Sequence, residues 1–341
     1  MQENPIHAEK ELKRRSNPAL RLLLAPEVGT LIPIIIVAIV TGAIKKGGLG
    51  NFYKFWTWKY FSSILKESVY IGTCALGEAL IIMNGEIDLS LGMSGCFGGI
   101  MMGVAAYMWN WPLLPCVLLC VVSSCLIGFI NGMLVTRLNL PSWITTLATQ
   151  FVCTGLAVTI GQGIPLNISS LGVKEFTRAK PLGLTWLFFI FIAIIVIVDF
   201  VVRKTQFGYK LRAVGGNTEA ALMAGINTKN VKLMVFVAAA FLASIGGLFD
   251  VLANGAAADT YGVGREFRCI ICCNVGGIAA GSGSIYGVAL GILLFHVLRA
   301  CLQSIGFNTN VQLMIIGIVL LLAVVLDVFR KRMEKKDISR L

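Results

Sequence analysis

Apolar residues along this chain come in long unbroken runs rather than at the spacing of an amphipathic helix or strand. The run VQLMIIGIVLLLAVVLDVF (311–329) contains one charged residue, Asp327, which lies close to its end. The run WLFFIFIAIIVIVDFVV (186–202) contains only Asp199. Because about 20 apolar residues are needed to cross roughly 30 Å of hydrocarbon, runs of this length predict membrane-spanning helices.

The runs together predict an all-α, polytopic membrane protein with about ten transmembrane helices. The predicted spans cover residues 28–44, 61–83, 90–108, 112–135, 143–161, 182–202, 231–253, 267–280, 284–302 and 311–329. The third and eighth are rich in Gly and Ser. We expect these two to be buried among the other helices, because small residues let helix backbones approach closely.

The positions of Lys and Arg predict the orientation of the chain. With both termini in the cytoplasm, the cytoplasmic side receives twice as many of the 29 basic residues as the outer side, which is the usual bias. This orientation predicts a cytoplasmic basic tail (1–27), a transmembrane domain (28–329) and a second cytoplasmic basic tail (330–341). Four lysines of the first outer loop oppose it: Lys45, Lys46, Lys54 and Lys59.

Composition supports a membrane protein and excludes a soluble domain. Hydrophobic residues make up 57% of the 341 residues and charged residues 13%, whereas globular domains carry about 25% charged residues. The net charge of +12 could suggest nucleic acid as a partner. The basic residues cluster at the ends of apolar runs, however, and we therefore expect no nucleic-acid partner.

Patterns for catalysis are missing, so we expect a non-enzyme without its own ATPase site. The chain has two histidines, His7 and His296, and no Walker-type phosphate loop. The glycine-rich segment GGIAAGSGS (276–284) follows no strand and lacks the required Lys. Three of the 10 cysteines form the pattern Cys269-x-x-Cys272-Cys273. Their apolar surroundings favour small buried residues over a metal site.

The hydrophilic segment 203–230 contains the sequence GGNTEAALMAGIN. Asn217 or Thr218 can cap a short helix, Glu219 falls in its first turn, and Gly225 is a natural stop. The predicted product is a short helix at the cytoplasmic surface. Because it carries Ala, Leu and Met rather than charges, a docking surface for a cytoplasmic partner is favoured over a solvated turn.

Three segments resemble one family of transport proteins. Glu219-Ala220-Ala221-x-x-x-Gly225 resembles the coupling-loop signature of ABC importer permeases, and FGYKLRAVGGNTEAALMAGI (207–226) resembles this loop in the ribose, xylose and galactose permeases. GEIDLSLG (85–92) is similar to the family's motif between its second and third spans. GFINGMLVTRLNLPSWITTLAT (128–149) resembles its connection between the fourth and fifth spans.

The resemblance implies a permease subunit of an ATP-driven importer for a monosaccharide or similar small polar solute, in the plasma (inner) membrane of a bacterium. It implies as partners cytoplasmic ABC ATPase subunits, a second permease copy or paralogue, and an extracytoplasmic substrate-binding protein. ATP and Mg would bind to the ATPase, and this chain would hold no cofactor. The residues expected to contact the ATPase are Gly216, Asn217, Glu219, Ala220, Ala221 and Gly225. The outer segment 162–183 would face the binding protein, or be an ordinary solvated loop.

The motif at 85–92 supplies further candidate residues, namely Gly85, Asp88, Ser90 and Gly92. We expect Asp88 and Ser90 to cap the third span, because unsatisfied backbone groups are costly near lipid. Direct contact of these two residues with substrate is the other interpretation.

Charges within spans are functional candidates by default. Glu78 stands where the family usually has an uncharged residue. It would either line the translocation pathway or pair with Arg299 or Lys66. Asp250 and Arg299 lie near predicted span ends, where their charged groups would reach the interface. The segment GGIAAGSGSIYG (276–287) is also looser than its counterpart in the family.

Two other functions stay open. One is a permease of the same superfamily for branched-chain amino acids, nucleosides or a sugar-like signal. The other is an ion-coupled secondary transporter, with Glu78 and Asp250 as relay groups. The second would leave the coupling-loop sequence without a role.

Overall fold

The computed structural model describes residues 57–173 and 181–305, together with 307, 308, 310–312, 314, 315, 317 and 318. The predicted first span, most of the predicted tenth span and both basic tails lie outside the described residues. The chain divides into a unit of residues 54–296 and a second unit of residues 1–53 and 297–341. The candidate site lies in the first unit.

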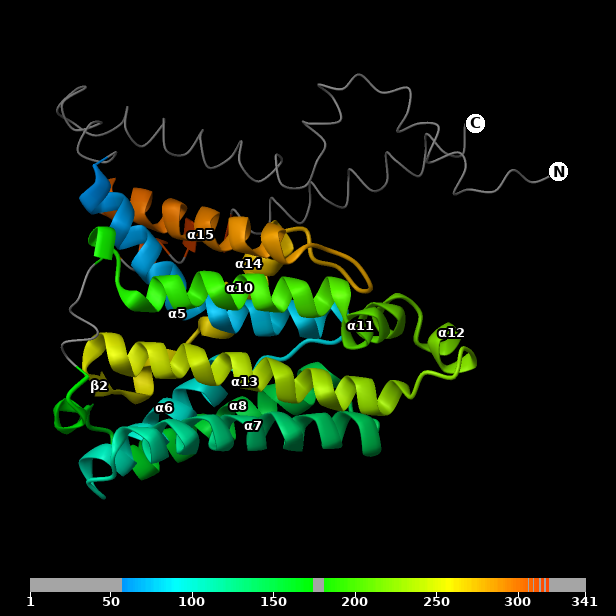
Figure 1. Cartoon of the computed structure of the whole chain (residues 1–341), viewed down its shortest axis with the longest axis horizontal. Helices are drawn as coiled ribbons and strands as arrows, with labels where there is room; N and C mark the ends of the chain where they lie inside the picture. Colours follow the sequence, from blue (N-terminus) through cyan, green and yellow to red (C-terminus); the bar gives the residue numbers. More distant parts are fainter. Residues whose placement is uncertain are drawn as a thin grey trace. The chain divides into compact units, whose positions relative to one another are not determined.

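The described elements are almost entirely helical (Figure 1). The longer helices are α5 (Trp58–Met83), α6 (Leu91–Tyr107), α7 (Leu113–Arg137), α8 (Ser142–Gly161), α10 (Trp186–Lys204), α13 (Thr228–Asn254) and α15 (Ile285–Ile305). The shorter ones are α11 (Gln206–Gly216), α12 (Thr218–Met223), α14 (Arg265–Val275), η1 (Ser169–Leu171), η2 (Pro181–Gly183) and η3 (Asp259–Gly262). Two short strands, β1 (Leu166–Asn167) and β2 (Ala256–Ala257), pair antiparallel, with Leu166 opposite Ala257.

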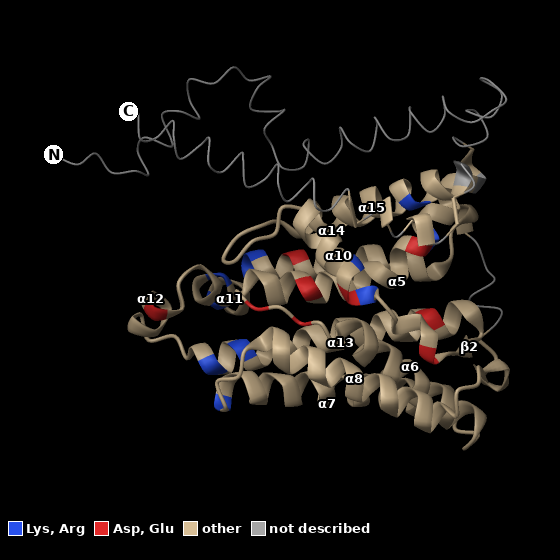
Figure 2. Ribbon diagram, turned by 180° about the vertical axis from the view of Figure 1, so that it is seen from behind, with Lys and Arg blue, Asp and Glu red and all other residues tan. Residues whose placement is uncertain are grey.

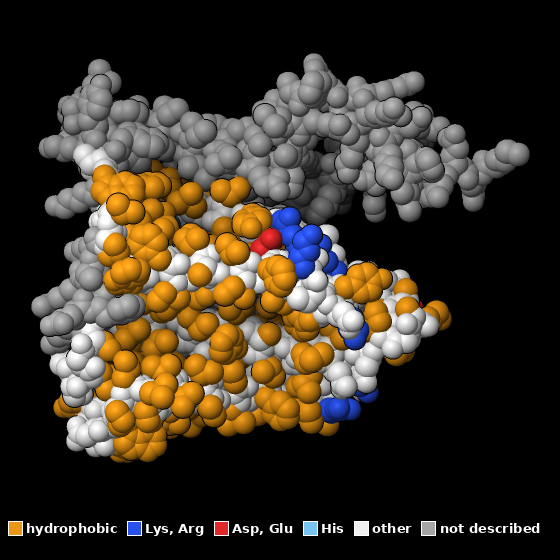
Figure 3. Space-filling model, viewed as in Figure 1, with side chains coloured by type: hydrophobic (Ala, Val, Ile, Leu, Met, Phe, Trp, Pro, Cys, Tyr) orange, Lys and Arg blue, Asp and Glu red, His pale blue; other side chains and the backbone are white. Residues whose placement is uncertain are grey.

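Helices α7, α8, α10, α13 and residues 285–303 of α15 are long and apolar enough to cross a membrane. Large apolar side chains are exposed along α7, α8 and α10, among them Leu118, Phe151 and Phe200. Hydrophobic side chains accordingly cover much of the face in Figure 3. An exposed apolar surface of this extent is typical of contact with lipid. The fold is therefore an all-α polytopic membrane fold, as the sequence predicts.

Helix α6 lies at the centre of the first unit, between α7, α8 and α13. Nearly all of its residues are buried, which confirms the expectation for the third predicted span. Its glycines make the packing possible. A Cβ at Gly95 would lie 2.3 Å from the carbonyl oxygen of Ala243, and a Cβ at Gly98 would lie 2.3 Å from the Ser124 hydroxyl.

The eighth predicted span differs from the structure. The predicted helix over 267–280 is too long, because α14 ends at Val275 and has 11 residues. At 1.5 Å per residue such a helix covers roughly 16 Å, about half of the hydrocarbon core. Segment 276–284 continues the crossing without helical structure, with positive φ at Gly277, Gly281 and Gly283.

The bundle has two distinct ends. One end, called here the α12 end, carries α11, α12, the last residue of α5 and the first residues of α8, α13 and α15. The opposite end, called the β end, carries β1 and β2. Lys and Arg gather at the α12 end in Figure 2, which agrees with the charge bias in the sequence.

Candidate functional site

Helix α12 forms an isolated projection at the α12 end of the bundle (Figure 1). The Asn217 side chain caps it, because Oδ1 accepts the N–H of Ala220 at 2.9 Å. This confirms one of the two caps that the sequence allows. Gly225 follows the helix with φ of +79°, a conformation that glycine adopts without steric cost.

Most of the predicted ATPase contacts are exposed on this projection. Gly216, Asn217, Glu219, Ala220 and Gly225 face solvent. Ala221 does not, since it is 4% exposed and lies on the inner side of α12. Its small side chain fits the role of a packing residue rather than a contact.

Two apolar residues of α12 were not among the predicted site residues. Leu222 is 62% exposed and Met223 is 90% exposed. Exposed large apolar side chains beside polar ones are typical of protein interaction surfaces. The sequence signal that identifies them is the run AALMAG (220–225), which carries no charge although it lies in a hydrophilic segment.

The second group of predicted residues lies where α5 connects to α6. The Asp88 carboxylate accepts the Ser90 N–H at 2.8 Å and the Ser90 hydroxyl at 2.6 Å. Ser90 is the N-cap residue of α6, but neither side chain makes a capping hydrogen bond to the first turn of the helix, and Asp88 instead holds Ser90 in place. The Ser90 oxygen accepts a hydrogen bond from the Asn131 amide on α7, and the Thr149 hydroxyl on α8 donates to Asn131.

Residues 84–90 have non-helical backbone at the depth of the helices around them. Such backbone is tolerated inside a membrane protein only where other groups satisfy it. Here α8 does so, because the N–H groups of Ile87 and Leu89 donate to the hydroxyls of Ser142 and Thr146. Glu86 also pairs with Lys232 on α13.

The two glycines of this motif have separate roles. Gly85 has φ of +82° and lets the chain turn at the end of α5. A Cβ at Gly92 would lie 2.8 Å from the Cβ of Arg265 and 2.9 Å from the carbonyl oxygen of Gly262. Gly92 therefore lets the start of α6 approach the start of α14.

Glu78 of α5 belongs to the same polar cluster. It is 1% exposed, and its Oε1 accepts the Asp88 N–H at 3.4 Å. Lys66 is twelve residues earlier in the same helix, roughly 18 Å away, which is too far for an ion pair. Within the part of the chain that the structure describes, Glu78 forms no ion pair. The geometry favours a structural role over pathway lining.

This role predicts how Glu78 responds to substitution. In Glu78→Gln the amide oxygen still accepts the Asp88 N–H, so we expect near-normal expression and uptake. Glu78→Leu removes the acceptor and should destabilise the protein by about 1–3 kcal/mol. Thermal unfolding in detergent and substrate uptake measure both effects. Lost uptake in a stably folded Glu78→Gln variant would instead place the carboxylate in the pathway.

Asp250 corrects an expectation from the sequence, because it is 5% exposed and does not reach an interface. Its partner is Arg265, which is 4% exposed and whose guanidinium lies 2.5 Å from the Asp250 carboxylate. The carbonyl of Tyr261 accepts a second bond from Arg265. The pair joins α13 to the start of α14.

Glu266, the next residue of α14, extends this link to α8. It is 3% exposed and accepts a hydrogen bond from the Gln150 amide at 2.8 Å. The start of α14 is thus held by polar contacts to both α13 and α8. Neither Arg265 nor Glu266 was a candidate from the sequence.

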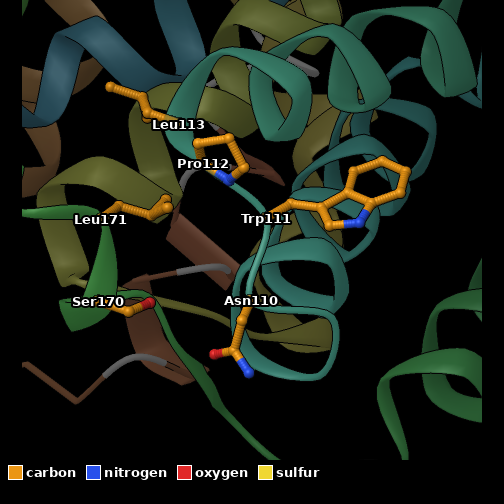
Figure 4. Close-up of a pocket in the computed structure, with 6 residues that line it drawn as sticks. All are labelled: Asn110, Trp111, Pro112, Leu113, Ser170 and Leu171. Carbon is orange, nitrogen blue, oxygen red and sulfur yellow. The ribbon is translucent and has the colours of Figure 1, made fainter.

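The β end carries a small hollow of about 340 Å³ between the α6–α7 connection and η1 (Figure 4). It is lined by Asn110, Trp111, Pro112, Leu113, Ser170 and Leu171. The Trp109 and Trp111 rings lie 5.1 Å apart beside it, and both are exposed. Exposed Trp residues are typical of a membrane–water interface. Residues 174–180 of the predicted outer segment lie outside the described residues.

A bundle of apolar helices joined by buried ion pairs and hydrogen bonds, with a projecting short helix, defines a polytopic membrane protein. Residues 60–324 match the family described as branched-chain amino acid transport system / permease component. The match covers most of the chain, and the chain therefore belongs to this family.

The similarity to individual known proteins covers most of this chain and most of each relative. The ribose import permease protein RbsC of Bacillus subtilis (strain 168) is 30% identical over 323 residues, which are 94% of this chain and 97% of the relative. The probable ABC transporter permease protein YphD of Escherichia coli (strain K12) is 28% identical, over 91% of this chain and 92% of the relative. The L-arabinose ABC transporter permease protein AraH of Azospirillum brasilense is 29% identical, over 82% of this chain and 83% of the relative.

Proposed function

We propose that this chain is the permease subunit of an ATP-driven importer for a monosaccharide, with pentoses as the first candidates. The similarity to ribose and L-arabinose permeases over most of the chain carries this proposal. A xylose transport system permease protein of Haemophilus influenzae is 28% identical over 80% of this chain and supports it. The family description names branched-chain amino acids, which stay the second candidate.

We place the α12 end in the cytoplasm, where α12 docks on an ABC ATPase that binds ATP and Mg. The exposed residues of α12 and the basic residues at this end support the assignment. The β end then faces outward, toward a substrate-binding protein. Ten spans with both termini inside, a second permease copy, and the inner membrane of a bacterium complete the proposal.

The ion-coupled alternative gains no support from the candidate relay groups. Asp250 is held in an ion pair with Arg265, and Glu78 holds the backbone of Asp88. Both carboxylates therefore have structural partners. Coupling through α12 assigns a role to its exposed surface, and ion coupling does not.

Uptake of labelled solutes by cells that express the chain with its ATPase and binding protein tests the substrate class. We expect D-ribose, D-xylose or L-arabinose to enter at least about tenfold faster than leucine, because sites built for substrate hydroxyls reject ligands that lack them. Cells without the ATPase serve as the control. Uptake of leucine alone would assign the chain to amino acid transport.

A further inference from the structure

Three backbone segments meet at one point at the α12 end of the bundle. The carbonyl of Met83, the last residue of α5, accepts the N–H of Gly281 at 2.8 Å. Gly215 of α11 lies against both groups, since a Cβ there would be 1.9 Å from the Met83 oxygen and 2.9 Å from the Gly281 nitrogen. We call these three residues the glycine junction.

The junction has no room for a side chain on either glycine. Gly281 has φ of +73°, and a Cβ there would lie 2.6 Å from the Cα of Gly216. Contacts of a real Cβ are almost never shorter than 3.0 Å. A methyl group on Gly215 would therefore displace α11 from α5 by about 1 Å, because packed interiors have few voids to absorb it.

Each member of the junction leads to a different part of the bundle. Met83 precedes the non-helical residues 84–90, which lead into α6. Gly281 lies in the non-helical residues 276–284, which join α14 to α15. Gly215 is one residue from the end of α11 and three residues from the start of α12. Helix α11 thus contacts both non-helical connections, because the Gly215 carbonyl oxygen would lie 3.6 Å from a Cβ at Gly85 and a Cβ at Gly215 would lie 2.9 Å from the Gly281 nitrogen.

The two helices reached through these connections also meet each other. Gly92 at the start of α6 lies against Arg265 at the start of α14. Side chains reinforce the links at the α12 end. Arg203 donates to the Ser284 hydroxyl at 2.9 Å, and Lys232 pairs with Glu86.

We propose that the glycine junction transmits displacement of α12 to both α6 and α14, with Gly215 and Gly281 as positioning residues for coupling. This rests on the proposed function, in which an ATPase moves α12. Interfaces packed backbone to backbone move as a unit, because they have little freedom to deform continuously. A single displacement of α12 by the ATPase would accordingly move both α6 and α14 inside the membrane.

Gly215→Ala tests this in the assembled transporter, in liposomes that contain the ATPase and the binding protein. Alanine stabilises a helix more than glycine does, so any loss of function in this variant must come from the clash of its methyl group with Met83 and Gly281. We expect uptake per ATP hydrolysed to fall about 10- to 100-fold, since a misplacement of about 1 Å at a distance can have this effect. Association with the ATPase and ATP hydrolysis should persist. The control is Gly155→Ala in α8, where a Cβ meets nothing within 4 Å.

If Gly215→Ala imports as much substrate per ATP hydrolysed as Gly155→Ala does, the proposal is overturned. Parallel loss of ATPase association would overturn it too, since Gly215 would then be part of docking alone. Hydrogen exchange of the wild-type complex, with and without a non-hydrolysable ATP analogue, needs no variant. The analogue should change the exchange rates of three segments together, namely residues 84–90, 206–216 and 276–284. A change in exchange rate confined to residues 206–225 contradicts the proposal. Wild-type liposomes without ATP-dependent uptake would instead reject the proposed function itself.

Discussion

Replacing Leu222 and Met223 together by Asp is expected to separate the ATPase from the permease while the permease still inserts and folds. The two side chains are 62% and 90% exposed, so the unbound protein loses little packing. Burial of one Leu or Met side chain in an interface contributes about 1.5–3 kcal/mol, and 1.4 kcal/mol is a tenfold change in affinity. We therefore expect ATPase affinity to fall at least about tenfold, with uptake lost in proportion. Co-purification from membranes and uptake assays measure this.

The matched control is Leu182→Asp. Leu182 is 80% exposed and lies just before α10, at the opposite end of that helix from α11 and α12. This change introduces a charge at an exposed apolar position without touching α12, and ATPase association should stay unchanged. Full co-purification of the ATPase with the α12 variant would show that α12 is not the docking surface.

Removing the Asp250 carboxylate is expected to cause the largest loss of stability. Asp250→Ala leaves the buried Arg265 guanidinium without its partner, which typically costs about 3–5 kcal/mol. Replacing both residues by apolar ones, Asp250→Leu with Arg265→Met, should recover most of this loss, because apolar replacement of a whole buried pair is often neutral. Thermal unfolding in detergent, with the remaining folded protein detected by size-exclusion chromatography, ranks the variants by stability.

The pair between Asp199 and Arg203 provides the comparison. These residues lie 2.7 Å apart, one turn from each other on α10, and the Arg203 side chain is 43% exposed. The Asp199 side chain is only 10% exposed, but after Asp199→Ala the Arg203 guanidinium still reaches solvent and the Ser284 hydroxyl, so stability should fall by no more than about 1 kcal/mol. Equal loss from Asp199→Ala and Asp250→Ala would mean that burial of the Arg265 pair has no special effect.

The sequence predicts the membrane class and most helices because long apolar runs depend only on local composition. It also predicts α12 and a cap at Asn217 or Thr218, of which the structure shows Asn217, since a cap acts within three residues. It fails at α14, where the apolar run continues past Val275 but glycines with positive φ end the helix. Apolar content alone does not distinguish a helix from irregular backbone.

Long-range pairs are the other part that sequence reasoning misses. Arg265 looks like a loop residue, because basic side chains usually lie outside the hydrocarbon. Its partner Asp250 lies on another helix, and only the fold brings the two together. The glycine junction has the same origin, since Met83, Gly215 and Gly281 are distant in the chain.

Reconstituted liposomes test the central claim most directly. They would contain the full-length chain with its ATPase and binding protein, and uptake of a labelled pentose would be measured with ATP, without ATP, and with an imposed proton or sodium gradient. The account predicts uptake that requires ATP and the ATPase and that does not respond to the ion gradient. Uptake by the chain alone, driven by the gradient without ATPase, would contradict it.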